Sequence, residues 1–266
     1  MSREFAPGVH WLPNCLGREE PTGWMHIHAS CYLVVGPERA LLVDTGHPAH
    51  WATISKTLDE LLGGRTLDYV FPTHTEIPHA GNLERLLRRY PDAIALGDVR
   101  DLHLFYPAIA DRLEARVAGD VVSLGGDVEL ELVEPAIRDL PNTLWAMLAP
   151  AGILFVSDGF MLSHQVGADD EEAVHAPGEC LLTTAEVEWP PDLRRVTFVT
   201  ERSIYWMRFA EPGEAMRRMR EAIARHAPAF VAPTHSNVVE GAAPLLELMD
   251  RAWSEIAATE VNSGSV

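Results

Sequence analysis

Four short apolar segments of this sequence each end on a side chain that can bind a metal. They are Leu41–Asp44, Tyr69–His74, Ile153–Asp158 and Phe230–His235. Their length and their valine, leucine and phenylalanine content predict buried strands rather than helices. Ligands of open α/β sheets bind beyond the carboxyl ends of the strands. The four endings therefore predict a metal or ligand site at one edge of a sheet.

Strand-like and helix-like segments alternate along most of the chain. The runs at 31–36 and 93–96 are typical of buried strands, and 121–133 predicts a hairpin around Gly-Gly-Asp. The amphipathic stretches, which carry their apolar residues on one side, lie at 50–64, 82–90, 213–226 and 243–258. This alternation predicts an α/β fold.

The segment 159–195 differs from the rest of the chain because it has an acidic run, several prolines and glycines, and little periodicity. We expect a long loop there, of the kind that often forms a lid or a binding loop. No linker divides the sequence, so we expect one domain over residues 1–258 and a flexible tail at 259–266.

The composition excludes several classes of function. Acidic residues outnumber basic ones 39 to 21, which gives a formal net charge of -18 and argues against nucleic-acid and membrane-surface partners. No apolar run is long enough to span a membrane, and the N-terminus does not resemble a signal peptide. Three widely spaced cysteines give neither a disulfide framework nor a CxxC metal site, so we expect a cytoplasmic location.

The densest group of metal-binding side chains lies in the stretch FPTHTEIPHAGN at 71–82. It places His74, Glu76 and His79 at spacings of two and three. Residues two apart do not share a face of a helix, so a regular helix would separate His74 from Glu76. A loop that leaves a strand can turn all three inward, around one or two ions.

The loop HTEIPHAGN resembles the HxHxDH loop of the metallo-β-lactamase superfamily, in the HxExDH form of flavodiiron and related oxygen-binding diiron proteins. The segments LLVDTGHP, LFVSDGF and APTHSN match further motifs in the superfamily's order, and the likeness covers about residues 8–240. The resemblance implies an αββα sandwich, in which two mixed sheets are covered by helices.

The resemblance also implies a set of metal ligands. His74 and Glu76 would hold one metal, His79 and His235 a second, and Asp158 would bridge them. Asp139 in IRDLPNT occupies the place of another family ligand, usually a histidine, and would complete the first site.

The chain departs from the family at a further position of the loop. Pro78 replaces the aspartate before the second loop histidine, and proline offers no side-chain ligand. Either a dinuclear site with a less complete second metal or a single bound metal is therefore consistent with the sequence. Asp44 matches an aspartate that orients the ligand loop by hydrogen bonding.

Three histidines with three carboxylates favour iron, with manganese and zinc as alternatives, because zinc hydrolases use mostly nitrogen and sulfur ligands. We therefore expect a non-haem iron oxidoreductase, with two ions or one, that binds or reduces a small oxidant such as O2 or NO. The alternatives are a metal-dependent hydrolase and a diiron oxygenase of an organic substrate.

The electron donor follows from the same resemblance. Complete family enzymes carry a flavodoxin domain after this one, and residues 236–266 are too few for it. Electrons are therefore expected from an external flavin or iron-sulfur reductase. We also expect a homo-oligomer.

Other residues have simpler interpretations. Asp139 could instead pair with the adjacent Arg138. His26 and His28 alternate along a probable strand and are expected at the surface. Cys31 and Cys180 are expected to be buried, unreactive thiols.

Overall fold

The computed structural model describes residues 1–20, 23–165, 178–188, 191–204, 206, 209 and 211–258. The expected tail at 259–266 lies outside these residues, as do the parts of the expected loop at 166–177 and 189–190. Side chains at 18–20, 23–25, 164–165 and 202 are likewise outside the description.

The first sheet of the described chain has seven strands in the order β1-β2-β5-β6-β7-β8-β9. Their bounds are Arg3–Ala6, Val9–Leu12, Cys31–Val35, Ala40–Val43, Tyr69–Phe71, Ile94–Gly97 and Leu113–Ala115. The strands from β1 to β6 pair antiparallel, and those from β6 to β9 pair parallel. The sheet is therefore mixed, as the resemblance implied.

The second sheet of the described chain has six strands in the order β10-β11-β12-β13-β15-β16. Their bounds are Val121–Ser123, Glu129–Val133, Trp145–Leu148, Ile153–Phe155, Phe230–Ala232 and Val239–Glu240. β13 and β15 are parallel, whereas the other neighbours are antiparallel. The predicted hairpin at 121–133 is present as the β10–β11 pair.

Alternation of side chains along the strands builds one core between the sheets and one outside each sheet. In β6, Leu41 and Val43 join the core between the sheets, whereas Leu42 joins the core under the helices of the first sheet. Successive strand residues face opposite sides, so a strand that is apolar at every position is buried on both faces.

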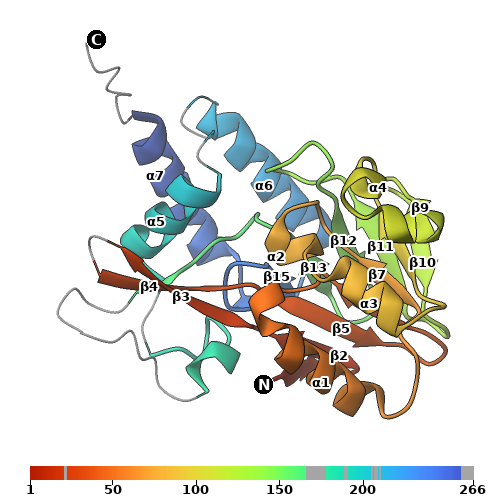
Figure 1. Ribbon diagram of the computed structural model, residues 1–266. Helices are drawn as coiled ribbons and strands as arrows, with labels where there is room; N and C mark the ends of the chain where they lie inside the picture. The colour runs from red at the N-terminus through yellow and green to blue at the C-terminus, as the bar shows by residue number, and fades with distance from the viewer. Residues whose placement is uncertain are drawn as a thin grey trace, which may run out of the picture.

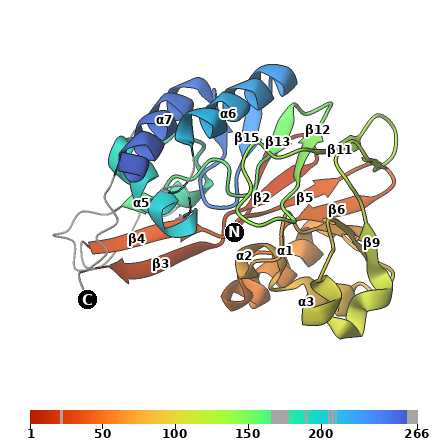
Figure 2. The same cartoon turned by 90° about the horizontal axis from the view of Figure 1, so that it is seen from above.

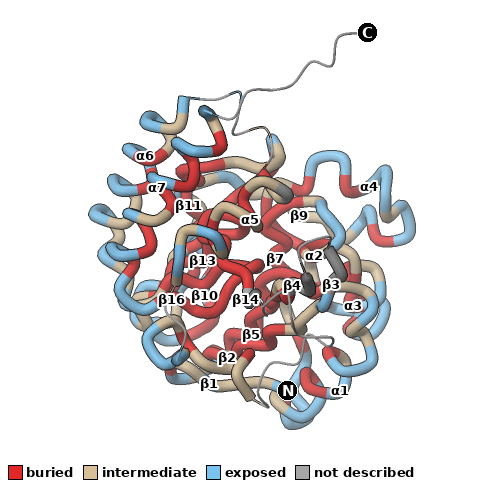
Figure 3. Tube along the Cα trace, turned by 90° about the vertical axis from the view of Figure 1, so that its left-hand side faces the viewer, coloured by how far each residue is buried: buried red, intermediate tan, exposed pale blue. Residues whose placement is uncertain are grey.

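Helices cover the outer faces of both sheets. The core outside the first sheet takes residues from α1 (Trp51–Leu62) and α3 (Leu83–Arg89). The core outside the second takes residues from α5 (Leu193–Ser203), α6 (Pro212–His226) and α7 (Ala243–Ala258). Figure 2 shows α6 and α7 on one side of the sheets and α1 and α3 on the other, and Figure 3 shows buried strands inside partly exposed helices. The predicted αββα sandwich is confirmed.

Most predicted elements lie within a few residues of the observed ones. Helix α1, predicted over 50–64, ends at Leu62 and is capped by Gly63, which takes the left-handed conformation that glycine favours (φ 56°). The remaining short helices α2 and α4 span Ile77–Ala80 and Leu102–Phe105.

The expectation of a continuous loop over 159–195 needs correction in its described parts. Short strand β14 (His164–Gln165) pairs with β4 (Gly23–His28), which pairs with β3 (Cys15–Glu20) in a third small sheet. Residues Glu179–Leu181 form the 3-10 helix η3, and helix α5 begins at Leu193. Backbone pairing with the distant β4 explains why local periodicity did not indicate a strand here.

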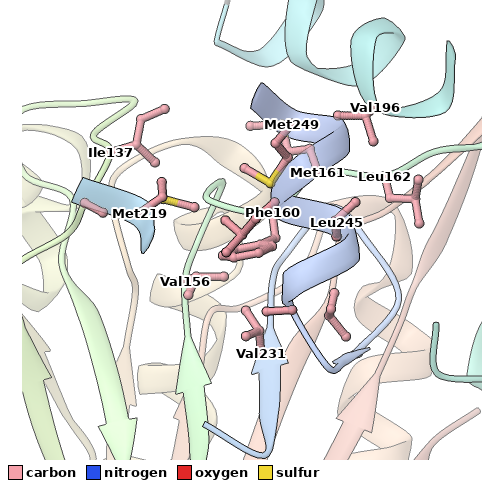
Figure 4. Close-up of a cluster of buried hydrophobic side chains, with 14 of the residues drawn as sticks. Ile137, Val156, Phe160, Met161, Leu162, Val196, Met219, Val231, Leu245 and Met249 are labelled. Carbon is pink, nitrogen blue, oxygen red and sulfur yellow. The ribbon is translucent and has the colours of Figure 1, made fainter. Parts of the chain in front are cut away.

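Phe160 lies at the centre of the core outside the second sheet and is fully buried. Figure 4 shows it among side chains from α6, α7 and β15, and near Val156, which follows β13. We expect Phe160→Ala to lower the free energy of unfolding of the metal-free protein by about 3–5 kcal/mol, because a large cavity would replace the ring. Denaturant unfolding measures this free energy. Phe105→Ala is the control, because Phe105 is 68% exposed, and it should change the free energy of unfolding by less than about 0.5 kcal/mol.

None of the helices in the described part of the chain is both long enough and apolar enough to cross a membrane.

Candidate metal centre

The ends of four central strands meet at one edge of the sandwich. Asp44 follows β6 and His74 comes three residues after β7, and these two strands are parallel neighbours. Asp158 and His235 each come three residues after β13 and β15, which are also parallel neighbours. Parallel strands deliver their carboxyl ends to the same edge, so the sequence-distant side chains converge as predicted.

The two sheets are tied together at this edge by backbone hydrogen bonds. Leu144 N donates to Thr73 O at 2.9 Å, and Ser30 N donates to Thr234 O at 3.0 Å. Within the loops of the first sheet, Thr45 N donates to His79 O at 2.9 Å. These bonds fix the loops that carry His74, His79 and His235.

Asp158 lies between three buried histidines. Its Oδ1 is 3.3 Å from His79 Nε2 and 3.3 Å from His235 Nε2. Its Oδ2 is 3.5 Å from His74 Nε2. Asp158 is therefore in contact with every imidazole of the expected ligand set, which is the placement that a bridging carboxylate requires.

Each histidine is oriented by a partner at its other ring nitrogen. His79 Nδ1 lies 2.9 Å from Asp44 Oδ2, and His74 Nδ1 lies 3.0 Å from Ser157 Oγ. His235 Nδ1 donates to the carbonyl oxygen of His28 at 2.7 Å. In the neutral form, with its proton on Nδ1, such an imidazole presents the lone pair of Nε2 to the space around Asp158.

Asp44 organises this outer layer and contacts no more than one of the histidines. Its Oδ1 accepts hydrogen bonds from Thr73 N and Thr73 Oγ1 at 2.8 and 2.9 Å. Its Oδ2 accepts from Thr234 Oγ1 at 2.6 Å and faces His79 Nδ1. All its acceptor positions are thus used by the protein, which agrees with the orienting role that the sequence suggested.

The chemistry of the inner atoms fits a metal ion. His74 Nε2, His79 Nε2 and Asp158 Oδ1 are buried and have no hydrogen-bond partner. Buried polar atoms are normally satisfied, and leaving one unpaired costs about 1–3 kcal/mol. Ligand atoms of His74, His79 and Asp158 all lie within 4.8 Å of one another. A cation bound between them would satisfy all three at once.

Glu76 and Asp139 extend the group on the side of His74. Ligand atoms of these three residues also lie within 4.8 Å of one another, although Glu76 is exposed and Asp139 is half-buried. Asp139 Oδ1 accepts a hydrogen bond from Trp206 Nε1 at 3.2 Å. His74 thus belongs to two groups, one rich in imidazole and one rich in carboxylate.

The alternative pairing of Asp139 with Arg138 is not what the structure shows. Arg138 contacts Glu134 Oε1 at 2.5 Å and donates to the carbonyl oxygen of Thr143 at 2.8 Å. The Asp139 carboxylate is left to face Glu76 and His74.

The charges at the centre are strongly coupled. Burial disfavours a charged His79, but the carboxylates of Asp44 and Asp158 outweigh burial and raise the pKa of His79 to about 10. Burial, together with the neighbouring His79, lowers the pKa of His74 to about 3. Burial opposes ionisation of Asp158, but His79 and His74 hold the pKa of this carboxyl well below its usual range. The two aspartates therefore favour positive charge in the space that they share.

Burial and the negative charges of Asp158 and Glu76 raise the pKa of Asp139 to about 6. Three carboxylates brought close together repel one another unless a proton or a cation lies among them. This repulsion favours the binding of a highly charged cation on the side of His74.

Pro78 lies in the first turn of the short helix α2, whose N-cap residue is Glu76. Proline suits this position because its missing N–H would have no partner in the helix. The turn directs His79 into the buried centre, while residue 78 adds no ligand. Around the second expected metal, the three side chains from the family pattern are thus His79, Asp158 and His235.

Sequence reasoning missed the residues that orient the ligands, namely Thr73, Ser157, Thr234 and the carbonyl group of His28. A signal for two of them was present, because Thr73 and Thr234 occupy the same place in the twin sequences FPTH and APTH. Their hydroxyl groups meet on the two oxygens of Asp44. Ser157 precedes an aspartate without any comparable repeat.

Comparison with known proteins agrees with this fold. The profile of the metallo-beta-lactamase superfamily matches residues 26–178. The chain therefore belongs to the metallo-beta-lactamase superfamily.

Among its relatives is a coenzyme F420H2 oxidase from Methanothermobacter marburgensis, 31% identical over 138 residues, which are 49% of this chain and 34% of the relative. The chain thus spans about a third of the length of this curated relative.

Solved structures share the fold. Rubredoxin oxygen:oxidoreductase from Desulfovibrio gigas superposes with a TM-score of 0.67 at 17% identity, over 97% of this chain and 61% of that one. A fragment (1–254) of a putative diflavin flavoprotein A 5 from Nostoc sp. PCC 7120 gives a TM-score of 0.67 at 13% identity, over 97% and 94%. Relatives of this kind are flavodiiron cores and oxidases, as the sequence motifs implied.

Proposed function

We propose that this protein is a non-haem diiron oxidoreductase that reduces a small oxidant, O2 or NO. The observation that carries the proposal is the set of unpaired buried atoms around Asp158, next to the carboxylates of Glu76 and Asp139. The names of the relatives support it, since one is an oxidase and another an oxygen:oxidoreductase. We assign this activity to a single domain over residues 1–258.

In this proposal, His74, Glu76 and Asp139 would hold one iron, His79 and His235 would hold the other, and Asp158 would serve both. Bound iron would supply one-electron chemistry and open coordination positions for a diatomic molecule. The carboxylates favour iron over zinc because oxygen ligands stabilise the ferric state. The chain's own contribution is to hold these donors in place before any ligand arrives.

The protein residues around the centre have separate tasks. Asp44 holds His79, Ser157 holds His74, and the carbonyl of His28 holds His235, so that each Nε2 faces inward. Trp206 fixes the carboxylate of Asp139. Such fixed outer contacts typically contribute 10–100-fold to metal affinity or activity. We assign the supply of electrons to a separate flavin or iron-sulfur reductase.

Metal analysis of protein isolated without chelators, followed by anaerobic reduction and mixing with O2 or NO, tests the proposal. We expect iron as the main metal and consumption of the oxidant by the reduced protein, with a change in visible absorption. Protein that contains zinc, cleaves simple esters and does not consume either oxidant would overturn it and favour the hydrolase alternative.

Glu76→His should shift the metal preference from iron towards zinc. The change replaces one of the three carboxylates of the centre by an imidazole, and nitrogen-rich sets favour zinc. Competition between Fe2+ and Zn2+, measured by elemental analysis at fixed total metal, should show a lower iron-to-zinc ratio. Glu60→His, at an exposed glutamate on α1, should leave the ratio unchanged. Equal ratios in wild type and Glu76→His would remove Glu76 from the ligand set.

A further inference from the structure

Two cysteines and a histidine from distant parts of the sequence meet beside the β3–β4 hairpin. Cys15 begins β3, His28 ends β4, and the two are directly paired across the hairpin. Cys180 comes from the 3-10 helix η3. A ligand atom of each of the three lies within 4.8 Å of the other two. Figure 1 shows the hairpin reaching away from the two large sheets.

The three side chains are held in an environment suited to binding. His28 and Cys180 are buried, with 1% and 4% of their surfaces exposed, and Cys15 is half-buried. His28 Nδ1 lies 3.0 Å from the carbonyl oxygen of Ser236, a contact that places a proton on Nδ1 and the lone pair on Nε2. This is the tautomer that metal-binding histidines adopt.

A further histidine supports the sulfur of Cys15. His26 is two residues from His28 on the same strand, so both point to the same face of the hairpin. His26 Nδ1 lies 3.2 Å from Cys15 Sγ, where an N–H can donate to a thiolate. The position that sequence reasoning expected at the surface is thus buried and in contact with a thiol.

We propose that Cys15, His28 and Cys180 form a second metal site, which binds a thiophilic divalent cation such as Zn2+. Thiolate and imidazole ligands select zinc-like ions, whereas the centre around Asp158 is rich in carboxylate oxygen. Binding replaces the two thiol protons, which pass to solvent, by two metal–sulfur bonds. Water occupies the fourth position, as in zinc sites with three protein ligands.

This site connects to the first centre through the backbone. His28 supplies a ligand through its side chain, and its carbonyl oxygen accepts the hydrogen bond that orients His235. The metal would join the hairpin to η3 and thereby fix this carbonyl. The inference stands on its own geometry and does not depend on the redox activity proposed above.

Cobalt titration of the reduced, metal-free full chain tests the inference. Co2+ in thiolate sites gives an intense sulfur-to-metal charge-transfer band in the near ultraviolet, and the ligand set proposed around Asp158 contains no cysteine. We expect wild-type protein to gain this band and to lose it when Zn2+ displaces Co2+. Cys15→Ser and Cys180→Ser should abolish it. Cys31→Ser is the matched control, because this third cysteine is absent from the cluster, and it should retain the band.

Alkylation of the unmodified chain provides a second measurement that does not depend on whether a variant folds. Zn2+ should slow the modification of Cys15 and Cys180, as followed by peptide mass spectrometry. The inference is overturned by absence of the band in wild type, or by its survival in both serine variants. Formation of a Cys15–Cys180 disulfide with no protection by Zn2+ would also overturn it, by showing a redox pair instead.

Discussion

Asp158→Asn should remove most of the bound iron. Asp158 contacts the Nε2 atoms of His74, His79 and His235, so its two oxygens serve both proposed ions at once. An asparagine keeps the shape but offers one neutral oxygen and one N–H2 group, which cannot bind a cation. The loss of affinity should exceed the 10–100-fold that changes in outer contacts typically cause.

Elemental analysis of the purified variant and iron titration of its metal-free form measure this effect. Asp127→Asn, at an exposed aspartate outside the centre, is the control and should bind iron as the wild type does. Circular dichroism separates metal loss from failure to fold. Unchanged iron content in a folded Asp158→Asn protein would rule out the bridging position.

Strand endings could be predicted from the sequence because their cause is local. An apolar run of four to six residues that stops at a histidine or aspartate is visible without any knowledge of tertiary structure. The resemblance of the motifs to those of the metallo-β-lactamase superfamily then implied the αββα sandwich. Asp44, His74, Asp158 and His235 accordingly lie at one edge, as expected.

Contacts between distant segments could not be predicted in the same way. The approach of Cys180 to Cys15 depends on the pairing of β3 with β4 and on the position of η3. Neither contact can be recognised from a regular spacing of residues in the sequence. Sequence reasoning treated Cys180 as an inert thiol for this reason. Cys31 lies outside the group of Cys15, His28 and Cys180, and burial raises the pKa of its thiol to about 12.

Helix α5 was missed although the sequence holds a signal for it. Asp192 is its N-cap and accepts a hydrogen bond from Arg195 N, and the buried Val196 and Val199 are three residues apart. An N-cap residue followed by apolar residues at helical spacing is a recognised start signal. Arg194 and Arg195, which lie between the N-cap and Val196, and the irregular segment before Asp192 concealed it.

Asp44→Asn should weaken the second metal position by about 10–100-fold, the usual effect of an altered outer contact. The Oδ1 position of Asp44 faces the backbone N–H of Thr73, which can only donate. The asparagine must therefore keep its oxygen there and turn its N–H2 group towards His79 Nδ1. Because the N–H2 group is a donor, His79 Nδ1 must become the acceptor. The single proton of the neutral imidazole then lies on Nε2. His79 would then present an N–H instead of a lone pair to the metal.

The same substitution should destabilise the metal-free protein by about 3–5 kcal/mol, because it removes one partner of a buried charge pair. Denaturant unfolding measures this loss, and metal titration measures the loss of affinity separately. Asp68→Asn is the matched control. The Asp68 carboxylate accepts one hydrogen bond, from Ala40 N at 2.8 Å. Ala40 begins β6, whereas Asp44 of the centre follows the other end of this strand. It should lower stability by only about 1 kcal/mol and leave metal binding unchanged. If Asp44→Asn lowers stability but binds both ions normally, Asp44 supports the fold alone and does not set the tautomer of His79.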